Sequence, residues 1–224
     1  MTPYYRDADV AIYLGDCRSV LPAVLTACDV VLTDPAYDAR THAGAMTNKD
    51  GSGTDGGSKI EMGFAPLESV RFVTDLTRVA RRWVVAFCAL EMLGTYREEG
   101  GETYLRGGFW RRTDGMPQVT GDRPAQPGEG LAILHRAGKK RWNRGGHHGY
   151  WECGVEHTNR VHPTQKPEAL MCSLVSAFSD PGETILDPFM GSGTTGVAAR
   201  RLGRKFIGIE LQEQWCEEAV RRLQ

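Results

Sequence analysis

The chain has 224 residues, a formal net charge of -1, and 41% hydrophobic and 25% charged residues. This length and composition are typical of one globular domain with a substantial core, and no apolar run reaches the roughly 18 residues of a membrane-spanning helix. The polar N-terminus has no signal-peptide pattern, and the six cysteines form no C-x-x-C pair. We therefore expect a cytoplasmic protein with reduced cysteines and no membrane association.

Short apolar runs that end at Gly, Asp or Pro dominate the first third of the chain. Residues 11–14 and 30–33 are predicted to be buried parallel strands, with a helix over 19–25 between them. Residues 38–63 are rich in Gly, Ser, Thr and Asp and contain few large apolar side chains. A segment of that length and composition predicts a loop that is either functional or disordered.

Two further strands are predicted in the middle of the chain, where the pattern is weaker. Pro66 is placed to open a helix, and an apolar face would follow on Phe72, Val73, Leu76, Val79 and Ala80. Residues 83–88 read as the next strand, and residues 131–134 as another.

The last third alternates clearly between helix and strand. Pro167 is predicted to start a helix with an apolar stripe formed by Leu170, Met171, Leu174, Val175 and Phe178. Strands are predicted over 184–186 and 205–209, and helices over 194–202 and 212–223, the last with its inward face on Trp215, Cys216, Ala219, Val220 and Leu223. This alternation at both ends of the chain predicts an α/β fold in which helices cover both faces of a parallel sheet.

A basic segment interrupts this pattern. Residues 104–148 contain nine Lys and Arg but only three Asp and Glu. The excess is what phosphate contact requires, although a solvated, salt-bridged surface would look the same. The tryptophans in this region are equally open to two interpretations, stacking on bases or anchoring a small core: Trp110, Trp142 and Trp151. The nearby histidines and Cys153 fit no common zinc spacing, so no metal is expected.

A glycine-rich turn near the C-terminus has the spacing of a nucleoside-binding loop. Gly191, Gly193 and Gly196 follow a predicted strand and open a predicted helix. Glycine permits a sharp turn and close approach of a ligand to the backbone. Glu210 ends the next strand, where a carboxylate can accept hydrogen bonds from a ribose diol. This pattern alone also fits a dinucleotide-dependent oxidoreductase.

A second motif, Asp34-Pro35-Ala36-Tyr37, directly follows the strand predicted over 30–33. The Asp34 carboxylate and the Pro35 carbonyl are both hydrogen-bond acceptors, and the amino group of a nucleic acid base presents two N–H donors. Acceptors that pull on both hydrogens favour a tetrahedral nitrogen and free its lone pair. Tyr37 supplies a ring on which a base flipped out of a duplex can stack.

These motifs together resemble the permuted, beta-group family of S-adenosylmethionine-dependent DNA amino-methyltransferases, which act on adenine N6 or cytosine N4. Five blocks match in the family's order: Leu14-Gly15-Asp16-Cys17, Asp34-Pro35-Ala36-Tyr37, His162-Pro163-Thr164-Gln165-Lys166-Pro167, Asp187-Pro188-Phe189-Met190-Gly191-Ser192-Gly193-Thr194 and Phe206-Ile207-Gly208-Ile209-Glu210. Ala36 departs from the family, which has a second proline there.

The resemblance implies a Rossmann-like, seven-stranded, mostly parallel sheet with helices on both faces and a circularly permuted order. Residues 1–95 would form the catalytic half, 96–160 a small target-recognition insertion, and 161–224 the cofactor half of the same domain. The implied catalytic residues are Asp34, Pro35, Ala36 and Tyr37. The implied cofactor-binding residues are Asp16, Cys17, Asp34, His162, Thr164, Gln165, Lys166, Asp187, Pro188, Phe189, Gly191, Ser192, Gly193, Thr194, Thr195 and Glu210.

The implied activity is site-specific methylation of double-stranded DNA, as in restriction-modification systems, with S-adenosylmethionine as methyl donor and with flipping of the target base. Aspartate rather than serine at position 34 favours adenine N6 over cytosine N4. A homodimer is expected because the insertion is short. Two alternatives from other classes stay open: a dinucleotide-dependent oxidoreductase, which leaves Asp34 to Tyr37 unexplained, and a non-catalytic DNA-binding relative, which the alanine at position 36 allows.

Overall fold

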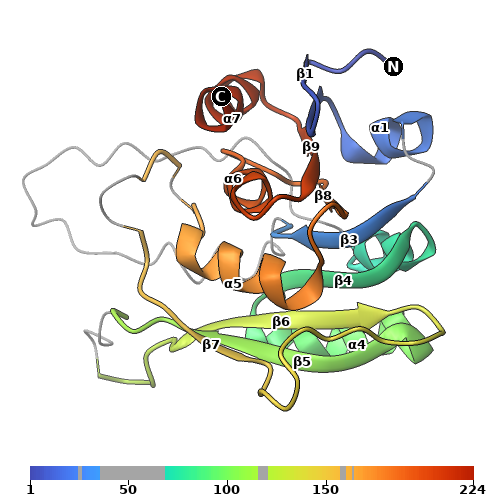
Figure 1. Ribbon diagram of the computed structural model, residues 1–224. Coiled ribbons are helices and arrows are strands. Elements are labelled where there is room, and N and C mark those ends of the chain that lie inside the picture. The colour runs from blue at the N-terminus through green and yellow to red at the C-terminus, as the bar shows by residue number, and fades with distance from the viewer. Residues whose placement is uncertain (25–26, 36–68, 116–120, 157–159, 163) are drawn as a thin grey trace, which may run out of the picture.

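The computed structural model describes residues 1–24, 27–35, 69–115, 121–156, 160–162 and 164–224. These residues form one sheet of nine strands (Figure 1). In spatial order they are β1 (Tyr5–Arg6), β2 (Val10–Leu14), β9 (Lys205–Glu210), β8 (Thr184–Asp187), β3 (Cys28–Thr33), β4 (Ala80–Cys88), β6 (Gly128–His135), β5 (Tyr104–Arg111) and β7 (Tyr150–Glu152).

The five central strands, β2 to β4 in spatial order, are all parallel. Antiparallel pairing joins β1 to β2, β4 to β6 and β6 to β5, while β7 runs parallel to β5. The prediction of a Rossmann-like, mostly parallel sheet is therefore confirmed. Among the described residues the sheet has two strands more than the seven expected, and the short edge strands β1 and β7 account for the difference.

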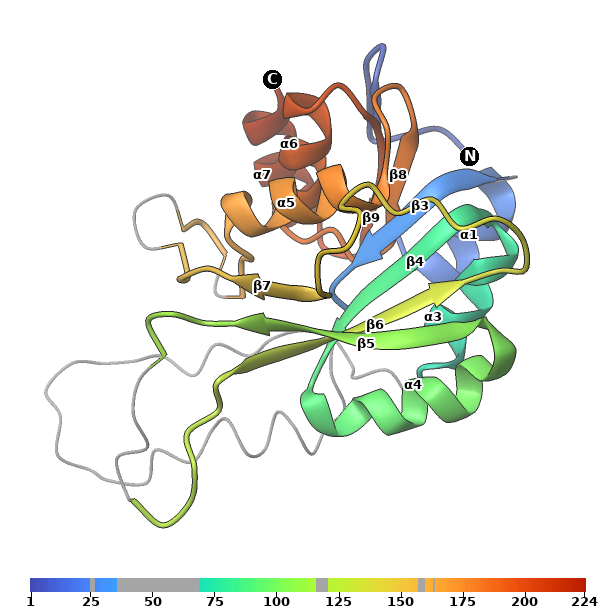
Figure 2. The same cartoon turned by 60° about the horizontal axis from the view of Figure 1, so that its bottom comes forward.

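Helices cover both faces of the sheet, as Figure 2 shows. One face carries α5 (Glu168–Phe178), α6 (Thr194–Arg201) and α7 (Glu213–Leu223). The other carries α1 (Cys17–Val24), α3 (Arg71–Asp75) and α4 (Leu93–Gly100), with short 3-10 turns at Leu76–Arg78, Leu90–Met92 and Gly101–Thr103. The core is accordingly split into two clusters, one on each side of the sheet.

The position of β4 in the middle of the sheet explains the apolar run from Trp83 to Cys88. Side chains of a strand point alternately to the two faces of a sheet. Trp83, Val85 and Phe87 enter the cluster under α5. Val84, Ala86 and Cys88 enter the cluster on the opposite face. Because both faces are covered, each position from Trp83 to Cys88 is apolar, and only the start of the strand carries charged residues, Arg81 and Arg82.

Helix α5 confirms the prediction made from its sequence. It begins directly after Pro167 and buries the five predicted apolar residues, Leu170, Met171, Leu174, Val175 and Phe178. The helix predicted after Pro66 is only partly correct. Among the described residues α3 stops at Asp75 and tightens into a 3-10 turn, and Ala80 already opens β4. The strand propensity of the Trp83–Cys88 run prevails there over the helical spacing.

The tryptophans of the middle segment belong to the core. Trp110 and Trp151 are 2% and 4% exposed, and Trp142 packs edge-on against Trp151 and Phe178. The interpretation of these rings as core anchors is therefore confirmed. The sequence did not predict β5, β7 or α4, all within or next to residues 96–160. Residues 38–63, predicted to form a loop, lie outside the described residues.

The parallel strands carry the predicted site residues to one edge. Asp16 follows β2, Glu210 ends β9, Asp187 ends β8 and Asp34 follows β3. These four strands are adjacent and point the same way, so their carboxyl ends meet. Ligands of open α/β sheets bind beyond the carboxyl ends of the strands. Within the described helices, none has the length and apolar character to cross a membrane.

Candidate functional site

The three glycines of the turn between β8 and α6 are needed for different reasons, some for backbone conformation and some for close packing. Gly191 has φ +49°, and a Cβ there would meet no described atom within 4 Å. Gly193 has φ +78°, and its Cβ would lie 2.8 Å from Cβ of Ala219 in α7. At Gly196 a Cβ would lie 2.7 Å from the Phe206 ring. Gly193 and Gly196 thus let α6 pack closely, while Gly191 leaves open space for a ligand to approach the backbone.

Asp187 ties the turn to the strand that carries Asp34. Its Oδ1 accepts hydrogen bonds from Thr33 Oγ1 at 2.7 Å and from the Phe189 N–H at 3.1 Å. Its Oδ2 accepts one from Thr195 Oγ1 at 2.6 Å. The carboxylate is 3% exposed. Burial raises the pKa of Asp187 to about 6, although these hydrogen bonds lower it. Asp187 therefore holds β3, β8 and α6 in register.

Replacing Asp187 by asparagine should change how stability depends on pH. The folded pKa of about 6 exceeds the ordinary aspartate pKa of about 3.9, so the native state binds the proton more tightly than the unfolded chain. The Asp187 contribution to stability is thus present below about pH 4 and lost as pH rises through 6. Relative to the wild type, Asp187→Asn should gain up to about 3 kcal/mol between pH 4 and 7. Thermal unfolding across that range measures it, and a constant difference would contradict the assignment.

Glu210, the predicted ribose-binding acid, lies beside the glycine turn. Its Oε2 accepts a hydrogen bond from the Gly191 N–H at 3.0 Å, and its Oε1 one from the Gln212 N–H at 2.9 Å. Burial raises the pKa of Glu210, and the backbone donors oppose the rise. The backbone carbonyl of the same residue accepts from the Gly15 N–H at 2.8 Å. Glu210 thereby joins the ends of β9 and β2 to the glycine turn.

Asp16 and Cys17, which follow β2, lie in different environments. Asp16 is half-buried and pairs with Arg18 at 2.5 Å, and the hydrogen bond from Arg18 lowers the pKa of its carboxyl. Cys17 is buried in the core beneath α1, and burial raises the pKa of its thiol to about 12. Asp16 thus lies at the shared edge, whereas the Cys17 side chain is a core residue. All six cysteines are free, as predicted.

The segment before α5 packs against α7. His162 lies edge-on to Trp215, with ring centroids 4.2 Å apart. Burial lowers the pKa of His162 to about 4, so its ring is neutral at pH 7. Its Nδ1 accepts a hydrogen bond from the Thr164 N–H at 3.2 Å. Gln165 accepts one from the Val161 N–H at 3.0 Å through its side-chain oxygen. These contacts set the path of the chain toward Lys166.

Lys166 reaches the predicted catalytic carboxylate. Its Nζ lies 2.6 Å from Asp34 Oδ2 and 2.9 Å from Glu129 Oε2. The Lys166 side chain is only 10% exposed, and its Nζ stands 4.9 Å from the centroid of the Phe87 ring. Burial lowers the pKa of Lys166, but the two carboxylates outweigh burial and leave it raised. Pro35 is buried beside Asp34. Ala36 and Tyr37 lie outside the described residues.

Three of the predicted cofactor residues on the glycine turn have side chains engaged elsewhere. Arg222 of α7 places its Nη1 3.0 Å from both Ser192 Oγ and Thr194 Oγ1, and the Thr195 hydroxyl donates to Asp187. Pro188 is buried, and Phe189 lies edge-on to Phe72 of α3 with ring centroids 6.0 Å apart. Contact of these five residues with a cofactor stays a prediction.

Three further residues shape this edge and were not predicted from the sequence: Thr33, Glu129 and Arg222. Glu129 had a usable signal, because it is a lone acid in the otherwise apolar strand β6. Such an acid is rarely buried without a partner. The partner of Glu129, Lys166, could not be predicted, because it comes from another part of the chain.

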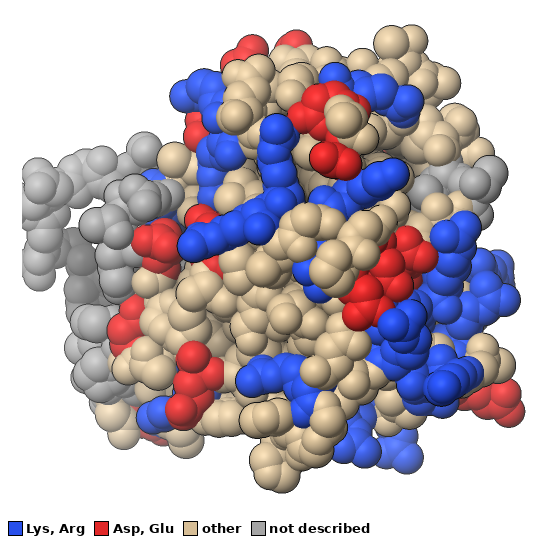
Figure 3. Space-filling view, viewed as in Figure 1, with Lys and Arg blue, Asp and Glu red and all other residues tan. Residues whose placement is uncertain are grey.

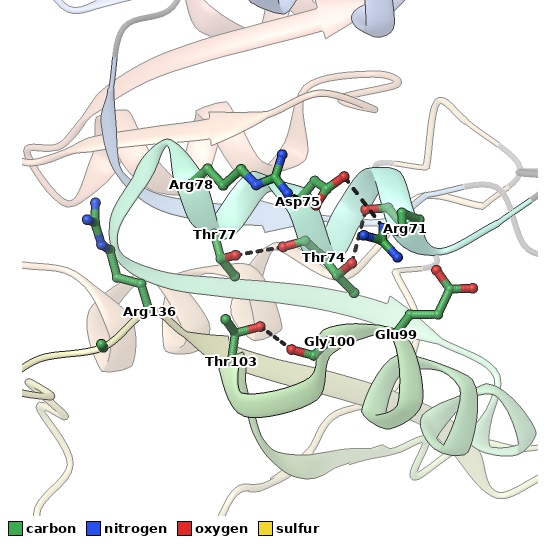
Figure 4. A pocket seen from close by; sticks show the side chains of 10 residues that line it. Arg71, Thr74, Asp75, Thr77, Arg78, Glu99, Gly100, Thr103 and Arg136 are labelled. Atoms are coloured by element: carbon green, nitrogen blue, oxygen red, sulfur yellow. Dashed lines mark hydrogen bonds and ion pairs between the residues drawn. The ribbon is translucent and has the colours of Figure 1, made fainter.

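A surface hollow of about 440 Å³ lies at the opposite edge of the sheet (Figure 4). The hydroxyls of Thr74, Thr77 and Thr103 donate to backbone carbonyls of their own helical turns. Asp75 pairs with Arg71 and Arg78. The residues that line this hollow come before β4, before β5 or after β6, at the edge of the sheet opposite to Asp34.

The basic residues of segment 104–148 lie in two groups at opposite edges of the sheet. Arg111 ends β5 opposite Gly128, and Arg112 follows it and donates its backbone N–H to Pro127, so both lie near the start of β6 and near Glu129. Residues 136–144 follow His135, which pairs with Trp83 at the beginning of β4. Figure 3 shows basic side chains gathered on the right of the molecule, over that far end of β6. Because β6 is antiparallel to β4, this second group lies roughly 20 Å from the Asp34 edge.

The strand order and the acids at its carboxyl edge define an α/β protein with a Rossmann-like ligand site. Residues 96–221, more than half of the chain, match the family model described as DNA methylase. The chain belongs to this DNA methylase family.

Curated relatives match over shorter stretches. Type II methyltransferase M2.DpnII of Streptococcus pneumoniae is 54% identical over 70 residues, which are 31% of this chain and 26% of that protein. DNA adenine methyltransferase YhdJ of Escherichia coli K12 is 55% identical over 62 residues, 28% of this chain and 21% of that protein. The chain thus spans about a quarter of the length of the curated relatives it matches.

Solved structures match over nearly the whole chain. The M1.HpyAVI–SAM complex has a TM-score of 0.70 and 26% identity, and covers 96% of this chain and 100% of its own. The cytosine-N4-specific PvuII DNA methyltransferase has a TM-score of 0.74 at 15% identity, covering 99% and 89%. The second likeness concerns the fold alone.

Proposed function

We propose that the protein transfers a methyl group from S-adenosylmethionine to the exocyclic amine of a base in double-stranded DNA. Adenine N6 is the favoured target. One observation carries the proposal: Asp34 directly follows β3, which lies beside β8, the strand that leads into the glycine turn, so an amine acceptor and a cofactor loop share one edge. Membership of the DNA methylase family and the likeness to the M1.HpyAVI–SAM complex support it.

The residues at this edge fit S-adenosylmethionine. Gly191 leaves its backbone open to a ligand, and Glu210 presents a buried carboxylate beside it. A carboxylate at the end of this strand can accept hydrogen bonds from a ribose diol. Asp16 follows β2, the strand beside β9, and would contact the adenine of the cofactor. The segment from His162 to Lys166 would border the methionine part of the cofactor. The cofactor supplies an electrophilic methyl group on a sulfonium.

Asp34 would prepare the amine. Its carboxylate and the Pro35 carbonyl accept the two N–H donors of the amine. The nitrogen lone pair then forms the bond to the methyl carbon, the carbon–sulfur bond breaks, and sulfur keeps the electron pair. The nitrogen becomes cationic and afterwards loses a proton. Catalysis thus needs positioning and a negative environment rather than a strong base.

Adenine is favoured over cytosine for two reasons. Position 34 is an aspartate, and YhdJ is named an adenine methyltransferase. Cytosine N4 remains the second candidate, because its amine presents the same two donors and the PvuII enzyme shares the fold. The two products differ in the modified base, so they are separable by analysis of hydrolysed DNA.

DNA would approach the carboxyl edge, with Arg111 and Arg112 as phosphate contacts nearby. In this proposal residues 96–160 are the target-recognition part, residues 1–95 the catalytic half and residues 161–224 the cofactor half. Strands β5 to β7 continue the main sheet, so recognition would depend on the segments that connect them. We also propose a homodimer, because the recognition part is small, and a cytoplasmic location, where DNA lies and thiols stay reduced.

The test is incubation of the purified protein with radiolabelled S-adenosylmethionine and unmethylated genomic DNA. The expected result is label in DNA, recovered as N6-methyladenine after hydrolysis. Expression in a methylation-free host, followed by modification-sensitive sequencing, would then define the site. Calorimetry with NAD serves as the control for the oxidoreductase alternative. Binding of NAD with no label in DNA would overturn the proposal.

A further inference from the structure

Among the described residues, the Asp34 carboxylate belongs to an ionic group of three side chains, Asp34, Glu129 and Lys166, that spans three strands. Asp34 follows β3, Glu129 is the second residue of β6, and β4 lies between those strands. Their backbones are therefore roughly 10 Å apart, too far for direct contact. Lys166 closes the distance, with its Nζ 2.6 Å from Asp34 Oδ2 and 2.9 Å from Glu129 Oε2.

The group is largely removed from water. The side chains of Lys166, Asp34 and Glu129 are 10%, 24% and 18% exposed. Below the ammonium lies the Phe87 ring of β4, 4.9 Å from Nζ to centroid, and the Trp110 ring stands 6.0 Å away. Charges so placed interact much more strongly than at a surface, and removing the lysine would leave two carboxylates that repel each other.

We infer that Lys166 and Glu129 are positioning residues for Asp34: Lys166 holds the carboxylate in place, and Glu129 offsets the lysine charge so that the group stays negative where the amine becomes cationic. This inference rests on the proposed function. With Lys166 alone beside it, Asp34 would form a neutral pair. Glu129 makes the net charge of the group -1, which favours the positive nitrogen of the transition state.

The charge of the group predicts the ranking of variants. Glu129→Gln leaves a neutral Asp34–Lys166 pair and should slow single-turnover methyl transfer about 10- to 100-fold. Lys166→Met removes the ammonium between the two carboxylates, whose repulsion then displaces Asp34 and slows transfer at least as much. The double variant Glu129→Gln/Lys166→Met restores a net charge of -1 and should be faster than either single variant. A merely structural pair would instead lose more in the double variant.

Single-turnover rates at saturating DNA and S-adenosylmethionine test this ranking, together with cofactor affinity by calorimetry. We expect the cofactor dissociation constant to change less than about threefold in Glu129→Gln while the rate falls. Glu98→Gln, at an exposed position of α4, removes the same charge and should keep the wild-type rate. Glu129→Asp should recover part of the rate by restoring the charge.

Two results would overturn the inference. One is a wild-type rate in Glu129→Gln, and the other is a double variant slower than both single variants. Thermal unfolding of each variant identifies any loss of rate that reflects an unfolded fraction. An inactive wild-type protein would contradict the proposed function itself, whereas an active wild type with unaffected Glu129→Gln contradicts only the role of this group.

Discussion

Replacing Asp34 by alanine is expected to eliminate methyl transfer while the protein still binds S-adenosylmethionine. The carboxylate directly follows β3, and Lys166 Nζ lies 2.6 Å from it. Its loss therefore removes the acceptor that would orient the amine and the charge that would stabilise it. Loss of such a preorganised group typically costs at least about 100-fold in rate. The cofactor loop lies on another strand and keeps its contacts to Asp187 and Glu210.

Label transfer to DNA and calorimetry with S-adenosylmethionine measure the two halves of this prediction. Asp75→Ala is a suitable control, because it removes an equal charge from an exposed ion pair at the opposite edge of the sheet. Asp34→Asn separates charge from shape, since it keeps one acceptor oxygen and should stay strongly impaired. Turnover at the wild-type rate in Asp34→Ala would exclude the assigned role.

Replacing Glu210 by glutamine is expected to weaken S-adenosylmethionine binding about 10- to 100-fold. Each carboxylate oxygen accepts a backbone N–H, from Gly191 at 3.0 Å and from Gln212 at 2.9 Å. The amide nitrogen of glutamine would face one of these donors, so one hydrogen bond to the backbone would be lost. The charge-assisted hydrogen bonds from a ribose diol to the carboxylate would be lost as well.

Calorimetry gives the affinity, and single-turnover rates at saturating cofactor show whether the chemical step is retained. Glu213→Gln, three residues later and exposed at the start of α7, is the matched control and should bind normally. We expect a rate within a few-fold of wild type once Glu210→Gln is saturated. Unchanged affinity in that variant would mean that the ribose lies elsewhere.

Local patterns predicted much of this molecule correctly. The strand at 184–186 and the helix after Pro167 lie within two residues of the structural bounds, because apolar spacing and Pro both act over a few residues. The same holds for the placement of Asp34, Asp187 and Glu210 at strand ends. Prediction failed where local preferences conflict, as at Ala80, and in β5, whose glycines and exposed positions give no clear period.

The sequence by itself determined the class of fold, the glycine turn and the strand-end carboxylates, because each is written in neighbouring residues. Only the tertiary structure decided which of these groups meet. Thr33 bonds to Asp187, 154 positions away, and Lys166 joins Asp34 to Glu129 across β4. It also decided that residues 136–144 lie at the far edge of the sheet. Those outcomes depend on strand order and register, which arise from packing between distant segments and leave no local pattern.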